Sequence, residues 1–522
     1  MAKKSRITYS IINLMSSMGL QLFSTILKFA VRTVFIHTLG KEYLGINGLF
    51  SDILTMLSLT ELGFDTAINF KLYKPLADND EKRIRILMKF YKQAYRAVGI
   101  VILLLGIALI PLLPKLIKDY DSLSVLGINA VVIFLLHIFS TVSSYLFFAY
   151  RSAIIKADQK KYILDIVDIV IEIVNSIAKI VVLVFLKDFT LYTATVIFFT
   201  IIKNFINAVI SQKFYPYVFQ KEKESISKEE FHGLIKDCGA LFVYKINGVV
   251  LKATDNMVLS TFIGLAIVGM YSNYLLVFTT LRTFLYKIYT SVKASAGNLF
   301  ATASMETKYN FFQTINYLTV VLYGTAAVGI SVCLNELIEV WAGEEYVIAQ
   351  PFSILIGIEL LFYGLMNNLG QIRNITGAFR QMWFRPILGA IINIITSVIL
   401  VQICGIYGVI IGTITATILT NFLVDPMVIH KYSFKNYKPV SEYYKKNIMY
   451  FVILVLVGAL DMFICNHLLV GYGWLSVISH AFIVVVTVPG VYIVFYRKTQ
   501  ECQYLLRISG SVMKKVKVRW KH

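Results

Sequence analysis

The chain has 522 residues, of which 57% are hydrophobic and only 15% are charged, and its formal net charge is +20. Its mean hydropathy is +0.70. Soluble domains are about half apolar and carry about a quarter charged residues, so this composition excludes an ordinary soluble protein. The Lys and Arg residues are distributed between apolar segments, which leaves no room for a separate nucleic-acid-binding domain. The composition predicts an all-α, polytopic membrane protein.

Apolar runs of about 20 residues, each long enough to cross a bilayer as a helix, recur from one end of the chain to the other. The pattern predicts fourteen spans. The second, fifth, seventh and eighth contain charged residues. The fourteen ranges are about 9–37, 43–70, 88–112, 123–149, 162–186, 190–212, 233–262, 266–292, 311–341, 350–371, 382–403, 406–429, 447–467 and 474–496.

The amino terminus, MAKKSRITYSIINLMSSMGL, is basic and then apolar. Its apolar part is long, is interrupted by Gln21, Lys28 and Arg32, and has no clear cleavage site, so we interpret it as a retained first span rather than a signal peptide. The five cysteines are scattered, without a CxxC or a Cys/His cluster. They predict neither a disulfide framework nor a metal site.

Alternate loops between the predicted spans are rich in Lys and Arg, which indicates their side of the membrane. The basic loops include KLYKPLADNDEKRIR, RSAIIKADQKK and HKYSFKNYKPVSEYYKK, and the tail after Tyr496 is also basic. By contrast, NELIEVWAGEEYVIAQ has four Glu residues and no Lys or Arg. Both termini and the linker around Lys221 are therefore predicted to be cytoplasmic, and the loop near Glu344 external.

An internal repeat relates the first span to the seventh. The segments LKFAVRTVFIHTLGKEYLG and LKATDNMVLSTFIGLAIVG align without a gap at an offset of 224 residues. Because six spans separate the copies, they enter the membrane in the same direction, as in transporters built from parallel repeats. We expect two parallel six-helix halves with pseudo-two-fold symmetry plus two C-terminal helices. The four matching pairs are Leu27 with Leu251, Lys28 with Lys252, Gly40 with Gly264, and Gly45 with Gly269.

The repeat and the hydrophilic segments together predict five parts of the chain, with a transport cavity between the two lobes. These parts are an N-terminal six-helix lobe over 1–215, a cytoplasmic linker over 216–232, a C-terminal six-helix lobe over 233–432, two extra helices over 433–496, and a basic cytoplasmic tail over 497–522.

Charged residues recur inside the predicted spans. Charges at mid-depth almost always face the bundle interior or water, and they are a functional hypothesis by default. Lys28 and Arg32 are four residues apart and share one helical face, whereas Asp255 is the only acid near the basic residues of the seventh and eighth spans. The predicted cationic site consists of Lys28, Arg32, Lys245, Lys252 and Arg282.

Four acidic residues are candidates for coupling to H⁺ or Na⁺, or for charge pairing: Glu61, Asp65, Asp255 and Glu359. The structural alternative is a set of interhelical ion pairs, such as Lys28 or Arg32 with Glu61 or Asp65. In the fifth span, ion pairing is the favoured interpretation of a charged stripe. That stripe consists of Asp165, Asp168, Glu172 and Lys179.

Signatures of enzymes and ATPases are absent from the sequence. It has no GxxxxGK[ST], HExxH or GxSxG motif, and its seven histidines are dispersed. Each of these motifs places the nucleophile, metal ligands or phosphate-binding backbone that its chemistry needs. We therefore predict a protein that is not an enzyme and has no cofactor.

Three segments carry a resemblance to a known family. They are TLGKEYLGINGLFSDILTMLSLTELGFDTAINFKLYKPL, TDNMVLSTFIGLAIVGMYSNYLLV and NNLGQIRNITGAFRQMWFRPILGAIINIITSVILVQICGIYGVIIGTITA. At these residues the chain resembles the polysaccharide flippases of the multidrug/oligosaccharidyl-lipid/polysaccharide exporter superfamily, and the resemblance covers nearly the whole chain. It implies that the protein moves an undecaprenyl-diphosphate-linked oligosaccharide from the inner to the outer leaflet of a bacterial plasma membrane by alternating access.

The product would serve the assembly of capsule, exopolysaccharide or a related cell-surface glycan, with a polysaccharide polymerase and other assembly proteins as implied partners. A monomer is expected, because one chain supplies both halves. The basic residues of the predicted site support a diphosphate-linked substrate independently of the resemblance, since Arg and Lys bind diphosphates.

Three alternatives stay open. A drug or cation antiporter of the same superfamily should have a more acidic and aromatic site. A flippase for a peptidoglycan or teichoic acid precursor would share the same charges. A scaffold or receptor without transport would leave the buried charges unexplained.

Overall fold

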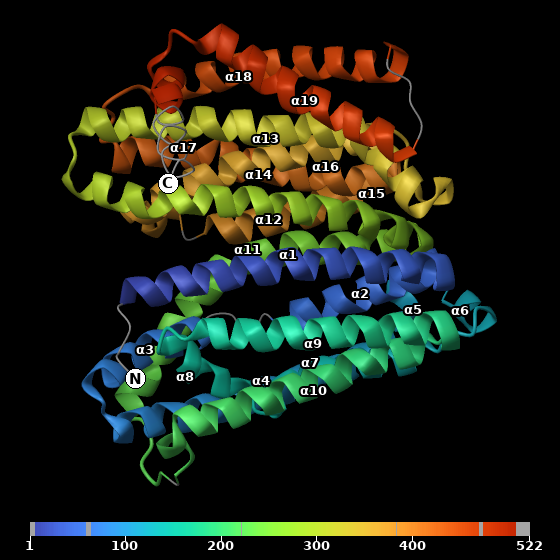
Figure 1. The fold of residues 1–522 in the computed structure, drawn as a ribbon, viewed down its shortest axis with the longest axis vertical. Helices are drawn as coiled ribbons and strands as arrows, with labels where there is room; N and C mark the ends of the chain where they lie inside the picture. The colour runs from blue at the N-terminus through green and yellow to red at the C-terminus, as the bar shows by residue number, and fades with distance from the viewer. Residues whose placement is uncertain are drawn as a thin grey trace, which may run out of the picture. The chain divides into compact units, whose positions relative to one another are not determined.

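The computed structural model describes residues 6–58, 64–118, 120–220, 222–382, 384–468 and 473–507. The predicted all-α class is confirmed, because helices follow one another along these residues and none of them forms a strand (Figure 1). The chain divides into two compact units, Met1–Gly269 and Met270–His522. The lobe boundaries predicted from the sequence, and the symmetry between the halves, stay predictions.

In the first unit, α1 packs along α9, α4 along α7, and α10 along both α7 and α9. The helix α11 packs along α2. These helices run from blue to green in Figure 1. Their bounds are α1 Arg6–Leu39, α2 Lys41–Leu57, α3 Phe64–Asp78, α4 Glu81–Leu109, α5 Leu113–Leu116, α6 Ser122–Val125, α7 Ala130–Leu146, α8 Ser152–Ala157, α9 Lys161–Val181, α10 Phe189–Phe214 and α11 Lys228–Phe262.

Several of these helices begin at a short polar side chain that caps the first turn. Asp80, Asn129, Asp188 and Ser227 each accept a hydrogen bond from the backbone N–H three residues later. Such a cap satisfies one of the backbone donors that the first helical turn leaves open. The caps therefore help to fix where α4, α7, α10 and α11 begin.

Two glycines of the internal repeat form equivalent helix connections. Gly40 joins α1 to α2 with a φ of 92°, and Gly264 lies between α11 and α12 with a φ of 133°. L-residues with a side chain rarely adopt such positive φ angles, whereas glycine does so readily. The repeated Gly at offset 224 is thus explained by the backbone of two similar turns.

The second unit contains the remaining helices, drawn from yellow-green to red in Figure 1. In this unit α13 packs along α14 and α19, α15 along α16, and α18 along α19. The first five residues of α12 belong to the first unit. The bounds are α12 Leu265–Thr302, α13 Met305–Ala342, α14 Pro351–Thr376, α15 Arg385–Cys404, α16 Ile406–Thr417, α17 Val424–Val428, α18 Val440–Phe463 and α19 Gly473–Tyr496.

Within the described residues, ten helices are long and apolar enough to cross a membrane, or eleven if the bent pair Ala130–Leu146 and Ala149–Ala157 forms one span. All fourteen predicted ranges overlap helices, although residues 59–63 of the second range lie outside the described residues. The protein is a multi-pass membrane protein; the count of fourteen spans stays a prediction.

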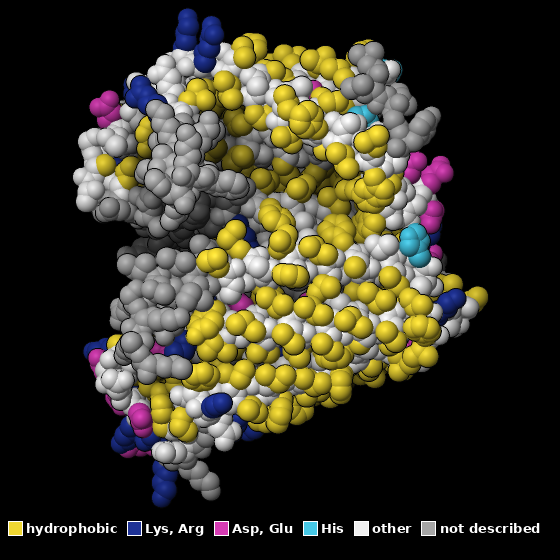
Figure 2. All heavy atoms as spheres, in the orientation of Figure 1, with side chains coloured by type: hydrophobic (Ala, Val, Ile, Leu, Met, Phe, Trp, Pro, Cys, Tyr) yellow, Lys and Arg dark blue, Asp and Glu magenta, His cyan; other side chains and the backbone are white. Residues whose placement is uncertain are grey.

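Apolar side chains cover the outer face of the first unit, as Figure 2 shows, and Lys and Arg gather near the helix ends. On α9 and α10 the exposed apolar side chains include Ile166, Val170, Ile177, Phe198 and Phe205. A large exposed apolar surface of this kind is expected where helices face lipid.

The predicted linker is held against the start of α4 by ionic contacts within the first unit. Arg85 Nε donates to Glu222 Oε2 at 3.1 Å, and Lys82 Nζ lies 2.5 Å from Glu224 Oε1. Arg83 pairs with Glu230 at the beginning of α11. The basic loop and the acidic linker are therefore complementary partners.

Candidate functional site

The two cations predicted on α1 lie in a charged cluster with α9 and α10. Lys28 is exposed and Arg32 is half-buried. Lys28 and Glu172 both interact electrostatically with Lys179, and Arg32 and Glu172 interact with Tyr192. The described members of this cluster are therefore three basic side chains and one carboxylate.

Beside this cluster, the first unit contains a polar cavity of about 400 Å³. Among its described lining residues only Leu54 and Val196 are apolar, and none is acidic. Its lining residues come from α2, α7, α9 and α10. The polar lining residues are Asn47, Ser51, Thr55, Ser58, His137, Ser140, Thr141, Lys179, Tyr192 and Thr193.

Three hydroxyl groups of this lining donate their protons to backbone carbonyls of their own helices. Ser51 Oγ donates to the Asn47 carbonyl at 2.6 Å, Thr55 Oγ1 to the Ser51 carbonyl at 2.7 Å, and Thr193 Oγ1 to the Phe189 carbonyl at 3.0 Å. A hydroxyl has two acceptor lone pairs besides its single donor. These side chains can therefore accept hydrogen bonds from a ligand.

Two nitrogen-bearing side chains complement the hydroxyls. His137 is only 8% exposed, and its ring packs edge-on against Phe50 at 5.8 Å between centroids. It forms no hydrogen bond with any described residue. The Lys179 ammonium lies 5.5 Å from the centroid of the Tyr192 ring, within cation–π range.

In the second unit, Arg282 of α12 stacks on Tyr363 of α14, with its guanidinium carbon 3.9 Å from the ring centroid. Glu359, one turn before Tyr363, is half-buried. The Arg282–Tyr363 distance is within cation–π range, so the aromatic ring positions the guanidinium.

The other predicted site residues are described less completely. Asp255 is buried on α11, at 5% exposure. Asp65 lies on α3, but its side chain is outside the described residues, as are the side chains of Lys245 and Lys252 on α11 and all of Glu61. The roles assigned to these residues stay predictions.

The charged residues of the stripe on α9 differ in their surroundings: two acids form ion pairs, and Lys179 lines the cavity. Asp165 is buried, pairs with Lys161, and accepts hydrogen bonds from Ser16 and Ser17 at 2.7 and 2.8 Å. Asp168 lies 3.6 Å from Lys203 of α10. The ion-pair interpretation fits these two acids, whereas Lys179 faces the cavity.

Sequence reasoning missed two acids that contact other helices. Asp425 of α17 is fully buried and is held by Arg373 at 3.1 Å and Arg385 at 3.3 Å. Asp52 of α2 accepts a hydrogen bond from Asn256 of α11 at 2.5 Å. An acid within an apolar run, as in LFSDIL and FLVDPMV, was the signal that could have found both.

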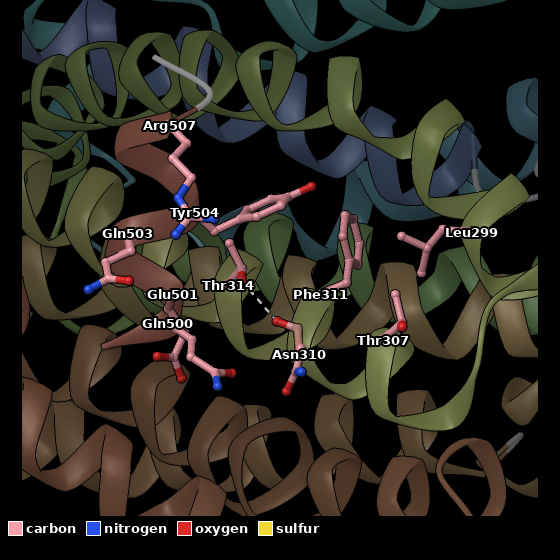
Figure 3. Close-up of a pocket in the computed structure, with 10 residues that line it drawn as sticks. All are labelled: Leu299, Thr307, Asn310, Phe311, Thr314, Gln500, Glu501, Gln503, Tyr504 and Arg507. Carbon is pink, nitrogen blue, oxygen red and sulfur yellow. Dashed lines mark hydrogen bonds between the residues drawn. The ribbon is translucent and has the colours of Figure 1, made fainter. Parts of the chain in front are cut away.

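A further recess of about 290 Å³ lies at one end of the second unit (Figure 3). Tyr504 and Arg507, from the last described turns, line it opposite Phe311 and Asn310 of α13. Nearby, Lys446 lies 2.8 Å from Glu501 and fixes this terminal segment to α18. Residues 508–522, the end of the predicted basic tail, lie outside the described residues.

No family model matches the sequence, and no curated protein sequence matches it. Solved structures do match the fold. The lipid II flippase MurJ, in an inward closed conformation, has a TM-score of 0.62 at 17% identity, covering 94% of this chain and 99% of its own.

An inward-facing multidrug resistance MATE family transporter of the MOP superfamily has a TM-score of 0.58 at 12% identity, covering 82% of this chain and 100% of its own. The Vibrio cholerae MATE transporter VcmN has a TM-score of 0.55 at 14% identity, with coverages of 82% and 98%. At these identities the likeness establishes the fold, which is a transporter fold of the MOP type. The matched proteins named here are transporters or flippases.

Proposed function

We propose that this protein is a flippase for a lipid-diphosphate-linked oligosaccharide, moving it from the inner to the outer leaflet of a bacterial plasma membrane. The observation that carries the proposal is the cationic cluster of Lys28, Arg32 and Lys179 among membrane-length helices. A diphosphate is an anion that Arg and Lys bind through charge-assisted hydrogen bonds. Arg282 in the second unit adds a further cation, which is stacked on Tyr363.

The fold supports a lipid-linked substrate more than a drug. The match to the lipid II flippase covers 94% of this chain, whereas the matches to the two MATE transporters each cover 82%. The described lining of the first-unit cavity has no acid, although an acid is expected where an organic cation binds. Capsule, exopolysaccharide or a related surface glycan is the proposed destination, and alternating access is the proposed mechanism.

A flippase for another lipid-linked wall precursor, of the teichoic acid or peptidoglycan type, is the second candidate, because the matched flippase acts on lipid II. The diphosphate is common to both candidates, so the cationic cluster serves either. Coupling to H⁺ or Na⁺ through Glu61, Asp65, Asp255 or Glu359 is part of the proposal, as is a cytoplasmic position for both termini.

The test is mass spectrometry of lipid-linked glycans in cells that lack the protein. We expect one lipid-diphosphate glycan to accumulate, and its composition separates the two candidates. Wild-type protein should clear it, whereas Arg32→Leu and Arg282→Leu should not. Lys213→Leu, which removes an exposed cation at the end of α10, is the matched control and should clear it. An unchanged glycolipid profile, or full clearance by both Arg variants, would refute the proposal.

A further inference from the structure

We propose that the polar cavity between α2, α7, α9 and α10 binds the sugar residue attached directly to the diphosphate. This inference rests on the proposed function, because it assigns the glycan end of the same substrate to a site of its own. It concerns residues that the cationic cluster does not include, apart from Lys179, which belongs to both.

The first observation is a histidine on the cavity lining whose ring nitrogens are open to a ligand. His137 is 8% exposed, lines the cavity, and has no hydrogen bond to the described residues. Its ring nitrogens are not among the buried side-chain atoms that lack a partner, so they are accessible from the cavity. A ligand hydroxyl in the cavity would supply the partner, because either ring nitrogen can donate or accept.

The second observation is the balance of donors and acceptors. Ser51, Thr55 and Thr193 offer acceptor lone pairs, since each donates its proton to a backbone carbonyl. Lys179 is a pure donor. Sugar hydroxyls both donate and accept, so a lining that supplies both matches them, whereas an inorganic anion would use only the donors.

The composition of the lining excludes two other classes of ligand. A hydrophobic cation would need an acid, and the described lining has none. A metal ion would need several carboxylate, His or Cys ligands, and no such group was found among the described residues. The volume of about 400 Å³ falls in the range of pockets that enclose small molecules.

The position of the cavity connects it to the predicted diphosphate site. Lys179 interacts electrostatically with Lys28, and Tyr192 with Arg32, so two lining residues lie next to the α1 cations. A diphosphate held by Lys28 and Arg32 would place its first sugar at the mouth of the cavity. Lys179 would then lie between the phosphate and the sugar.

The experiment measures binding of two natural lipids to purified full-length protein. One is the lipid-linked glycan extracted from cells that lack the protein, and the other is undecaprenyl diphosphate without a sugar. The variants are His137→Phe, which keeps the ring volume but removes the nitrogens, and His137→Gln, which keeps a donor and an acceptor. Arg32→Leu is the comparison for the diphosphate site, and Lys213→Met is the matched control.

We expect His137→Phe to weaken binding of the glycan-bearing lipid severalfold, up to about tenfold, and to leave binding of the bare diphosphate lipid unchanged. His137→Gln should retain most of the affinity, and Arg32→Leu should weaken both lipids. Equal affinities of wild type and His137→Phe for the glycan-bearing lipid, with an unchanged melting temperature, would overturn the inference.

The same experiment separates this inference from the proposed function. If wild-type protein binds neither lipid, the proposed function itself is wrong. If wild type binds both lipids and Arg32→Leu weakens both, but His137→Phe changes neither, the function stands and only the sugar site is wrong. A His137→Phe protein that fails to fold is replaced by Thr193→Val, which removes one acceptor that α10 contributes to the lining.

Discussion

Gly45 and Gly269 lie where the start of α2 crosses closely over the start of α12. Each glycine packs against the backbone of the other helix. A Cβ on Gly45 would lie 2.0 Å from the Leu265 carbonyl oxygen, and a Cβ on Gly269 would lie 2.0 Å from the Lys41 carbonyl oxygen. The two contacts are reciprocal under the offset of 224, since 41 + 224 = 265 and 45 + 224 = 269.

This crossing predicts that Gly45→Ala and Gly269→Ala each destabilise the protein by about 1–3 kcal/mol, because the added methyl group meets rigid backbone rather than a side chain that can turn away. Thermal unfolding of the purified protein measures the effect. Gly48→Ala is the matched control on α2, where the nearest atom to a new Cβ is Asn256 Nδ2 at 3.6 Å. Equal melting temperatures for Gly45→Ala and Gly48→Ala would contradict the prediction.

The buried Arg373–Asp425–Arg385 cluster predicts a second stability effect. Asp425→Asn keeps the volume but removes the carboxylate charge that two buried guanidinium groups contact, so we expect a loss of about 3–5 kcal/mol. Replacing all three residues with apolar ones should recover much of the loss, since removing every partner of a buried cluster is often tolerated. Glu344→Gln, on an exposed turn, is the control. A triple variant no more stable than Asp425→Asn would indicate a different role for the cluster.

The linker contacts predict a dependence on pH. A hydrogen bond from the Glu224 backbone N–H, and then the Arg85 side chain, hold the pKa of Glu222 below its ordinary value of 4.5. Because the folded pKa is the lower one, this contribution is present above about pH 4.5 and is lost as the pH falls through the folded pKa. Limited proteolysis should therefore cut the linker faster as the pH falls below about 4.5.

Glu222→Gln should make the linker susceptible at neutral pH and remove part of its pH dependence. Glu229→Gln, an exposed acid of the next helix, should behave as wild type. If Glu222→Gln and wild type are cut equally at every pH, the Arg85 contact does not hold the linker.

The predicted topology can be tested by thiol labelling of intact cells. Glu344 and Lys223 are both exposed, so a cysteine at either position is accessible if it faces the reagent. A membrane-impermeant maleimide should label Glu344→Cys and not Lys223→Cys. The background should carry Cys404→Ser, because Cys404 is the exposed native cysteine and the other four are buried. Labelling at Lys223→Cys alone would show that the orientation is the opposite of the predicted one.

The helices were predictable because long apolar runs in a membrane protein have few alternatives to a helix. The glycine repeat was also predictable, and the turns at Gly40 and Gly264 explain part of it. The site was predictable only in part. Lys28, Arg32 and Arg282 could be recognised as charges among apolar residues, but their neighbours could not, because contacts between distant helices leave no local pattern.

His137 shows where sequence reasoning stopped. A single histidine in a span is more often a core residue than a ligand, and nothing in AVVIFLLHIFS distinguishes the two. Lys179 was assigned to the charged stripe of its own helix, although its side chain lies beside Tyr192 of α10. Asp425 and Asp52 were visible as acids in apolar runs, yet their partners lie 40 or more residues away in the sequence.

The connection between α1 and α2 consists of Gly40 alone, with α1 ending at Leu39 and α2 beginning at Lys41. Because a single residue joins these two helices, we expect them to insert into the bilayer together as a hairpin. An epitope tag inserted after Gly40 would need to unwind a helix end, so tags belong elsewhere in the chain.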